Sequence, residues 1–306
     1  MHTVLITGGT GLVGKRLTHH LLEKGYKVII LTRSLDAKFN NDKLSYAIWD
    51  IKKQVIDINA IQAANTIIHL AGAGVVDKRW TSAYKKEILE SRVLSSKLII
   101  DALNKQEHQV KTIVSASAIG WYGADKVPGM YFTESDEPAN DFLGQICVAW
   151  EQSISVAASM NIRVCKLRAG IVLSDEGGAL AEFKKPLRFS VAAILGNGKQ
   201  VVSWIHIDDL CRMYIYAMEN NNINGSYNAV ASQPVTNKDL TLTLAKKMKG
   251  KFFIPVHVPA FVLKTILGES SIEVLKSATV SNEKIKAAGF DFLYPSIEPA
   301  LDDLIK

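Results

Sequence analysis

Short apolar runs alternate with longer segments of helical periodicity through the first half of the chain. The runs predict strands at Thr3–Ile6, Val28–Leu31, Tyr46–Trp49, Thr66–Leu70, Thr112–Val114 and Arg163–Leu167. Most of them are apolar at consecutive positions, so both faces of each strand are expected to be covered, as in a parallel sheet.

Helices are predicted between these strands. Apolar residues recur at helical spacing over Leu12–Lys24, Ala83–Asn104 and Leu143–Met160, and Gly25 is placed to end the first of these helices. The repetition of strand and crossover helix predicts an α/β fold with a doubly wound parallel sheet.

The regular alternation ends after Arg168. Glycines and prolines then interrupt the chain, and shorter helices are predicted at Lys238–Lys249, Ala260–Ile266 and Asn282–Ala288. We therefore expect a main domain over residues 1–170 and a smaller mixed lobe over residues 171–306, with the two interleaved in space.

Composition narrows the classes of partner. The net charge is +6 over 306 residues, but the lysines and arginines are scattered and form no dense basic block. Nucleic acid is therefore not an expected partner, whereas a mildly basic surface suits a small anionic ligand. Cys147, Cys165 and Cys211 lie far apart without the spacing of a metal site, so no metal is expected.

The start of the chain bears on its location. The first predicted strand begins two residues after the initial Met, which leaves no room for a charged leader with an apolar core. No apolar run reaches the roughly 20 residues that span a bilayer. We expect no membrane partner and a cytoplasmic location.

A glycine-rich turn follows the first predicted strand and opens the first predicted helix. The missing side chains of Gly8, Gly11 and Gly14 allow a tight turn and a close approach of the backbone to a diphosphate, and the helix N-terminus offers N–H groups to the negative charge. This context predicts a dinucleotide site in a Rossmann domain. The residues assigned to it are Thr7, Gly8, Gly9, Thr10, Gly11, Leu12, Val13 and Gly14.

The residues after the second strand indicate which dinucleotide is bound. An NAD site usually places a carboxylate there, where it accepts a hydrogen bond from the ribose 2′-hydroxyl. This chain has Thr32, Arg33 and Ser34, and a guanidinium pairs instead with a 2′-phosphate. NADP is therefore the expected cofactor, and the nearby Asp36 keeps NAD as the alternative. The remaining cofactor candidates are Asp50, beside the adenine amine, and Leu70, Ala71 and Gly72, whose backbone would flank the adenosine ribose.

These segments resemble extended short-chain dehydrogenases/reductases of the nucleotide-sugar epimerase/dehydratase kind. The segments that carry the resemblance are Thr7–Gly14, His69–Gly72, Ser115–Ser117 with Tyr122-Gly123, and Gly196–Asp209. The resemblance implies that Ser117 assists a tyrosine acid/base whose pKa is lowered by a lysine four residues later. In the matching register, Leu143 stands in place of the tyrosine and Cys147 in place of the lysine. Val202 replaces the arginine that pairs with a nucleotide-sugar phosphate, which disfavours such a substrate.

The chain is more closely similar to an atypical branch of this group, the epimerase family or SulA-homologue proteins, which end in a C-terminal domain of unknown function. The similarity covers nearly the full length and includes Arg79–Thr81, Ser117–Gly123, Ser203–Asp209, Asn228–Ala231 and Ala288–Phe290. It implies an NADP-binding fold with a C-terminal domain, but it does not establish an epimerase reaction.

Six residues are candidates for catalysis or for contact with a substrate: Ser117, Tyr122, Arg79, Trp80, Arg92 and His206. Ser117 would orient a carbonyl, and Tyr122 would exchange a proton if a cation lowered its pKa from about 10. Arg79 and Arg92 would together hold an anionic substrate.

Five of these six candidates have a structural alternative. Ser117 also suits a turn, Tyr122 suits aromatic packing beneath the lobe, and the two arginines suit solvated helix surfaces. His206 lies between two isoleucines, which favours a half-buried histidine. Asp208-Asp209 is predicted to cap the helix Leu210–Met218.

Three functions are consistent with this pattern. An NADP(H)-dependent oxidoreductase acting on a small carbonyl or hydroxyl compound is favoured, because hydride chemistry belongs largely to the cofactor. A non-catalytic NADP-sensing or interaction protein, related to cell division, is the alternative that Leu143 and Cys147 suggest. A nucleotide-sugar epimerase or dehydratase ranks third.

Overall fold

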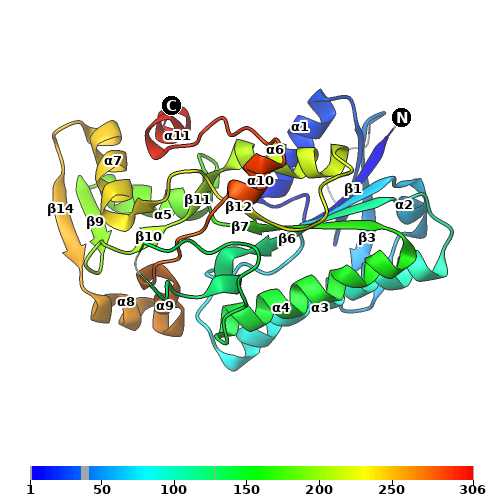
Figure 1. Ribbon diagram of the computed structural model, residues 1–306, viewed down its shortest axis with the longest axis horizontal. Helices are drawn as coiled ribbons and strands as arrows, with labels where there is room; N and C mark the ends of the chain where they lie inside the picture. Colours follow the sequence, from blue (N-terminus) through cyan, green and yellow to red (C-terminus); the bar gives the residue numbers. More distant parts are fainter. Residues whose placement is uncertain (1, 36–40, 128, 306) are drawn as a thin grey trace.

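An eight-stranded sheet runs through the larger part of the molecule (Figure 1). The computed structural model describes residues 2–35, 41–127 and 129–305. The strand order is β12-β7-β6-β5-β1-β2-β3-β4, and every neighbouring pair is parallel except β3 with β4. The strands are β1 Thr3–Thr7, β2 Lys27–Thr32, β3 Leu44–Asp50, β4 Val55–Ile56, β5 Thr66–His69, β6 Thr112–Ala118, β7 Arg163–Ala169 and β12 Gly225–Ala229. The predicted doubly wound parallel sheet is confirmed.

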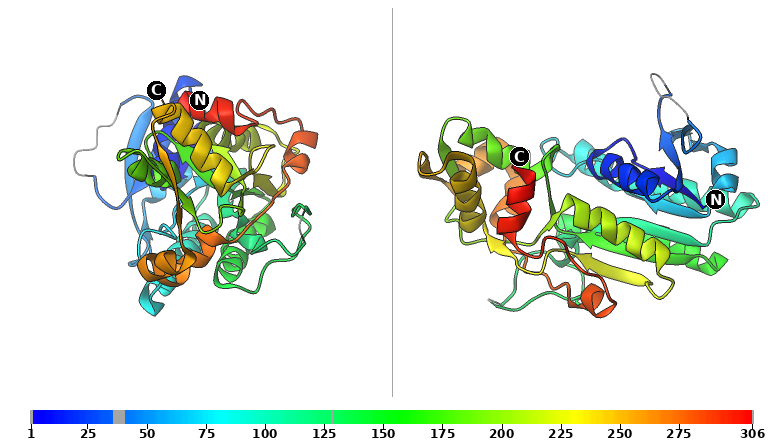
Figure 2. Two further views of the ribbon diagram at one scale, coloured as in Figure 1. Left: turned by 90° about the vertical axis from the view of Figure 1, so that its left-hand side faces the viewer. Right: turned by 90° about the horizontal axis from the view of Figure 1, so that it is seen from above.

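Helices cover both faces of this sheet (Figures 1 and 2). One face carries α1 Leu12–Glu23, α6 Ile207–Glu219 and α10 Glu283–Ala287, and the other carries α2 Ile58–Ala63, α3 Ser82–Lys105 and α4 Phe142–Ser155. Alternate residues of β1 therefore enter different cores: Ile6 packs in the cluster of Leu17, and Leu5 in the cluster of Leu98. Burial on both sides explains why these strands are apolar at consecutive positions.

The helix boundaries differ from the predicted ones in one instructive place. The predicted helix Leu143–Met160 is an α-helix, α4, followed by the 3₁₀ helix η2 Val156–Met160. The side chain of Asp141 caps α4 by accepting a hydrogen bond from the N–H of Gly144. Periodicity alone does not distinguish the tighter 3₁₀ turn from a continuing α-helix.

A smaller unit lies at one end of the main sheet (Figure 2). Its strands are β8 Ile171–Ser174, β9 Val191–Leu195, β10 Val201–Val202, β11 Trp204–His206, β13 Val235–Thr236 and β14 Ile254–Val258. Its helices are α5 Gly178–Leu187, α7 Asn237–Lys249, α8 Ala260–Leu267, η3 Gly268–Ser270, α9 Ser271–Leu275 and α11 Ile297–Leu304. Trp204, Leu240 and Leu301 are fully buried in its separate core.

The chain crosses between the two units more than once. After β8 and β11 it returns to the main sheet, where α6 packs beside α1 and β12 pairs with β7. The main sheet therefore contains residues from beyond 170, and the two units are interleaved.

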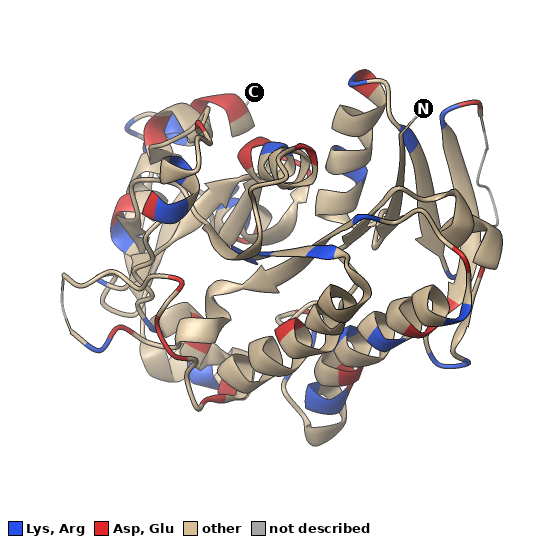
Figure 3. Ribbon diagram, turned by 45° about the vertical axis from the view of Figure 1, so that its right-hand side comes forward, with Lys and Arg blue, Asp and Glu red and all other residues tan. Residues whose placement is uncertain are grey.

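Charged residues of both signs are interspersed over the outer helices (Figure 3). In the part of the chain that the structure describes, no helix is long and apolar enough to cross a bilayer.

Candidate functional site

The glycine turn joins β1 to α1 at the carboxyl edge of the sheet. A Cβ on Gly14 would stand 2.3 Å from the carbonyl oxygen of Gly8 and 2.6 Å from the Cα of Gly9, so only glycine fits this contact. Gly8 itself has a φ of +70°, and its carbonyl accepts a hydrogen bond from the N–H of Gly11 at 3.0 Å. No side chain caps the first turn of α1, which leaves its N–H groups available to an anion.

Thr7 ties this turn to the loop after β5. Its Oγ1 accepts hydrogen bonds from the backbone N–H groups of Leu70 at 3.1 Å and Ala71 at 3.2 Å. The hydroxyl hydrogen of Thr7 is then left to donate to Nδ1 of His69 at 2.7 Å. Thr7 thus fixes the glycine turn relative to the loop after β5, the two backbone segments proposed to flank the cofactor. We call this set of hydrogen bonds the frame.

His69 extends the frame to α3, a role that the sequence prediction missed. Because Nδ1 accepts from Thr7, Nε2 carries the proton of the neutral ring and faces the hydroxyls of Ser95 at 3.3 Å and Ser96 at 3.2 Å. Both serine hydroxyls donate to the carbonyl of Arg92, so their oxygens are free to accept that proton. Complete burial, with a smaller effect from Arg92, lowers the pKa of His69 to about 3.

The residues after β2 and β3 lie near the surface. The Arg33 side chain is exposed and has no ion-pair partner among the described residues. Thr32 Oγ1 donates to the carbonyl of Ser34 at 3.0 Å. The carboxylate of Asp50 accepts hydrogen bonds from two N–H groups of its own turn, and Asp36 lies outside the described residues.

Leu143 and Cys147 face the turn after β6, where the resemblance implies a tyrosine and a lysine. A Cβ on Gly120 would lie 3.2 Å from the Cβ of Leu143 and 3.7 Å from the Sγ of Cys147. Burial raises the pKa of the Cys147 thiol to about 12, so the thiol stays protonated at neutral pH. Neither side chain therefore acts as a base at neutral pH.

Ser117 belongs to a buried network around Glu151. Ser117 Oγ donates to Glu151 Oε1 at 2.7 Å, and Arg168 donates from Nε to the same oxygen at 2.7 Å and from Nη2 to Oε2 at 3.1 Å. Ser226 donates the fourth hydrogen bond at 2.9 Å. Burial favours the neutral acid, but the bonds from Arg168 outweigh it and lower the pKa of Glu151. The Ser117 hydrogen is therefore committed to Glu151, and orienting a carbonyl would require this bond to break.

Tyr122 is locked into the same network. Its hydroxyl donates to Asn228 Oδ1 at 2.6 Å and accepts from Arg168 Nη1 at 3.0 Å, while its ring stacks on Phe132 with centroids 5.1 Å apart. Only 1% of its surface is exposed, and burial raises its pKa to about 12 despite the Arg168 charge. The arrangement matches the packing alternative, because the ring is buried against Phe132 and the hydroxyl proton is donated to Asn228.

Arg79 and Arg92 do not form the predicted pair. The exposed Arg79 guanidinium donates to the carbonyls of Thr265 and Ile266 at the end of α8, whereas Arg92 is buried and donates to Ala73. The two arginines bind different backbone segments, so they do not form a joint site for an anionic substrate.

Trp80 also binds a backbone segment, in the loop after β5. Its Nε1 donates to the carbonyl of Val75 at 2.8 Å, and its ring meets Phe142 edge to face at 4.9 Å between centroids. The loop after β5 is thereby fixed from a second side.

His206 is fully buried, so the structural alternative of a half-buried histidine underestimates its burial. Its Nδ1 accepts from the N–H of Asp208 at 3.1 Å, so His206 caps α6, and its ring stacks on Tyr294 at 3.9 Å. The predicted cap by Asp208-Asp209 is therefore wrong. Asp208 instead pairs with Arg16 at 2.6 Å, and Asp209 accepts from two backbone N–H groups of the C-terminal segment.

His206, Asp208 and Asp303 place potential ligand atoms within 4.8 Å of one another. The capping bond occupies the Nδ1 lone pair of His206, so Nε2 keeps the proton of the neutral ring, 3.5 Å from Asp303 Oδ2. In this tautomer neither ring nitrogen of His206 offers a lone pair to a metal, so the cluster does not suit a metal ion.

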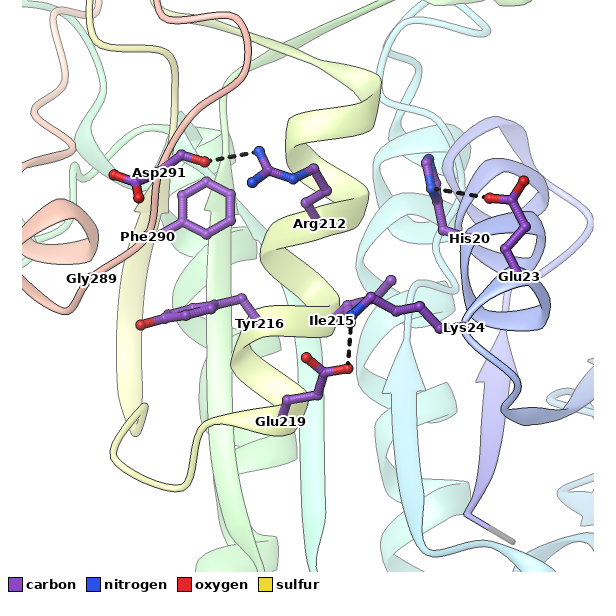
Figure 4. Close-up of a pocket in the computed structure, with 10 residues that line it drawn as sticks. All are labelled: His20, Glu23, Lys24, Arg212, Ile215, Tyr216, Glu219, Gly289, Phe290 and Asp291. Carbon is purple, nitrogen blue, oxygen red and sulfur yellow. Dashed lines mark hydrogen bonds and ion pairs between the residues drawn. The ribbon is translucent and has the colours of Figure 1, made fainter.

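A surface cavity of about 380 Å³ lies between α1, α6 and the segment Gly289–Asp291 (Figure 4). Both cations that line it are paired, Arg212 with Asp209 and the Asp291 carbonyl, and Lys24 with Glu219. The cavity lies at the C-terminal end of α1, and the 12 residues of that helix separate it from the glycine turn by about 18 Å. It is therefore distinct from the dinucleotide site.

Comparisons with known proteins agree with this geometry. The chain matches the NAD dependent epimerase/dehydratase family over residues 4–229 and a domain of unknown function, DUF1731, over residues 258–304. The chain therefore belongs to the NAD dependent epimerase/dehydratase family, with the extended short-chain dehydrogenase/reductase fold.

Proteins similar to this chain over nearly its full length occur in bacteria and in humans. An epimerase family protein of Staphylococcus haemolyticus is 36% identical over 311 residues, which cover 100% of this chain and 99% of the relative. The crystal structure of the human epimerase family protein SDR39U1 with NADPH superimposes with a TM-score of 0.87 at 25% identity, over 99% of both chains. A nucleoside-diphosphate sugar epimerase from Corynebacterium glutamicum has a TM-score of 0.78 at 32% identity, over 99% of this chain and 58% of its own.

Proposed function

We propose that this chain binds NADP(H) along the carboxyl edge of its main sheet and acts as an oxidoreductase on a small carbonyl or hydroxyl compound. The observation that carries the proposal is the uncapped N-terminus of α1 behind a turn in which Gly14 admits no side chain. Free N–H groups and close backbone approach are what a diphosphate requires.

The preference for NADP rests on Arg33. Its exposed guanidinium follows β2 and is not engaged in an ion pair with any described residue, so it is available to a 2′-phosphate. The NADPH in the human relative's structure supports the same assignment. Thr32 and Ser34 would line that pocket, and the backbone of Leu70, Ala71 and Gly72 would flank the adenosine ribose.

The reaction would depend little on protein acid/base groups. The bound cofactor supplies hydride, and the protein positions it through the frame of Thr7 and His69. The Tyr122 hydroxyl is buried and donates to Asn228, the Cys147 thiol is buried, and Ser117 donates to Glu151, so the proton added to a reduced carbonyl would come from solvent.

Absorbance at 340 nm tests this proposal directly. Purified protein is first titrated with NADPH to establish binding and is then mixed with a panel of aldehydes, ketones and oxo acids. Substrate-dependent loss of absorbance is expected for at least one class. Silence across the panel with NADPH bound would contradict the oxidoreductase proposal.

A second candidate function, sensing of NADP(H) without catalysis, is favoured by the side chains of Leu143 and Cys147. A nonpolar residue and an inert thiol at these positions suit a protein that binds NADP(H) and signals its presence to a partner. Affinity capture from a cell extract with and without NADPH distinguishes this role, because partner binding that ignores the cofactor would remove the sensing function.

A further inference from the structure

Arg92 is a buried cation without a carboxylate partner. It lies on α3 with 8% of its surface exposed, and its Nη1 donates to the carbonyls of Ala73 at 3.0 Å and Ile88 at 2.9 Å. No acidic side chain of the described residues forms an ion pair with it, and its Nε and Nη2 find no acceptor among those residues. Burial lowers the pKa of Arg92, which reflects the cost of keeping this charge away from water.

The neighbouring buried carboxylate does not compensate this charge. Glu151 lies one turn beyond Cys147 on α4, but its two oxygens are already matched by the guanidinium of Arg168. The region therefore carries one excess positive charge. A buried charge is ordinarily paired, so an unpaired one is a candidate for pairing with a ligand.

The guanidinium lies between the loop after β5 and helix α4. A Cβ on Gly72 would stand 3.1 Å from Arg92 Cζ, and the guanidinium carbon lies 4.7 Å from the centroid of the Trp150 ring. Trp150 Nε1 is a second buried donor without a partner among the described residues. The charge is thus adjacent to the backbone proposed to flank the cofactor.

Contacts within α3 and with the loop after β5 hold Arg92 in place. The carbonyl of Arg92 accepts from Ser95 and Ser96, which connect through His69 to the glycine turn. Ser91 Oγ accepts from the N–H of Ala73, the residue whose carbonyl binds the guanidinium. Such a preorganised donor pays little conformational entropy on binding.

We propose that Arg92 binds a carboxylate of the substrate, so that the substrates are oxo acids or the corresponding hydroxy acids. This inference rests on the proposed oxidoreductase function. The cofactor itself does not supply a suitable partner for Arg92. Its ribose hydroxyls are neutral and would leave the excess charge uncompensated, and its diphosphate is expected at the start of α1, away from α3. A planar carboxylate matches the fork of a guanidinium, whose Nε and Nη2 lie on one edge.

Calorimetric titration with oxamate, set against its uncharged analogue oxamide, tests the inference without requiring turnover. NADPH is titrated first, and oxamate is then added to the NADPH-saturated protein. Oxamate is expected to bind the wild-type complex at least tenfold more tightly than oxamide. Arg92→Met should weaken oxamate at least tenfold, and Arg92→Lys, which keeps the charge but loses the fork, by a smaller factor. NADPH affinity should change less than threefold in both variants.

Arg188→Met is the matched control, because Arg188 is an exposed arginine at the end of α5. Its oxamate affinity should stay within twofold of wild type. Equal binding of oxamate and oxamide, or unchanged oxamate binding in Arg92→Met, would overturn the inference. If Arg92→Met does not fold, unchanged oxamate affinity in Arg92→Lys does the same. Absence of NADPH binding in the wild type would instead refute the proposed function on which the inference rests.

Discussion

The turn after β1 and the turn after β6 lie on the same edge of one sheet, yet they are built differently. The first is made of backbone, with Gly14 against Gly8 and with the N–H groups of α1 left uncapped. The second is made of side chains that bind one another, with Glu151 and Arg168 at the centre. The first turn is open to a ligand, whereas the polar groups of the second are already satisfied.

The difference shows that one fold can keep the features that bind a cofactor while it lacks those that acid/base catalysis requires. A site for NADP is expected to combine glycines, free N–H groups and a cation near β2, and the chain supplies all three. Proton transfer needs a group with an accessible proton and a suitable pKa. Around β6, the burial of Tyr122 and Cys147 moves both pKa values to about 12.

Breaking the ion pair after β6 should have the largest effect on stability. Glu151→Gln leaves the buried Arg168 charge without its partner, which typically costs about 3–5 kcal/mol. Urea unfolding monitored by circular dichroism measures this loss. Glu182→Gln, at an exposed ion pair on α5, is the control and should change stability by less than about 0.5 kcal/mol. Equal stability of Glu151→Gln and wild type would show that the network after β6 is not structural.

Filling the turn after β1 should abolish cofactor binding. Gly14→Ala places a Cβ 2.3 Å from the Gly8 oxygen, so the turn must move, and we expect NADPH affinity to fall at least 100-fold. Gly25→Ala is the control, because no atom lies within 4 Å of an added Cβ. Its φ of +85° makes alanine unfavourable by about 1 kcal/mol, but NADPH affinity should not change. Tight NADPH binding by Gly14→Ala would place the cofactor elsewhere.

Removing the Tyr122 hydroxyl tests whether this residue is structural or catalytic. Tyr122→Phe leaves Asn228 and Arg168 each with one hydrogen bond fewer, and we expect a loss of about 2 kcal/mol in unfolding free energy. Turnover of any substrate found by the 340 nm panel should change less than twofold. A fall of 100-fold or more in turnover with stability preserved would instead identify Tyr122 as the proton donor.

Much of the fold, including the glycine turn after β1, was predictable because it depends on local sequence. Consecutive apolar residues mark strands covered on both faces, and the glycine spacing sets a turn within eight residues. His69 was missed because its role depends on Thr7, 62 residues earlier, and on two serines of α3.

The side-chain network after β6 was less predictable because its members are distant in sequence. Ser117 and Glu151 are 34 residues apart, and Tyr122 and Asn228 are 106 apart. Likewise, alternation along β11 predicts a half-buried His206, but Tyr294 from the C-terminal segment covers the ring. Partners brought in by tertiary packing leave no periodic signal in the chain.

Fluorescence titration of wild type and Arg33→Ala with NADPH and NADH tests the central claim most directly. Wild type is expected to bind NADPH more tightly than NADH, and Arg33→Ala is expected to weaken NADPH binding about tenfold while NADH affinity stays within twofold. Equal affinity of wild type for the two dinucleotides, or an equal loss of both in Arg33→Ala, would contradict the assignment of NADP(H) to this site.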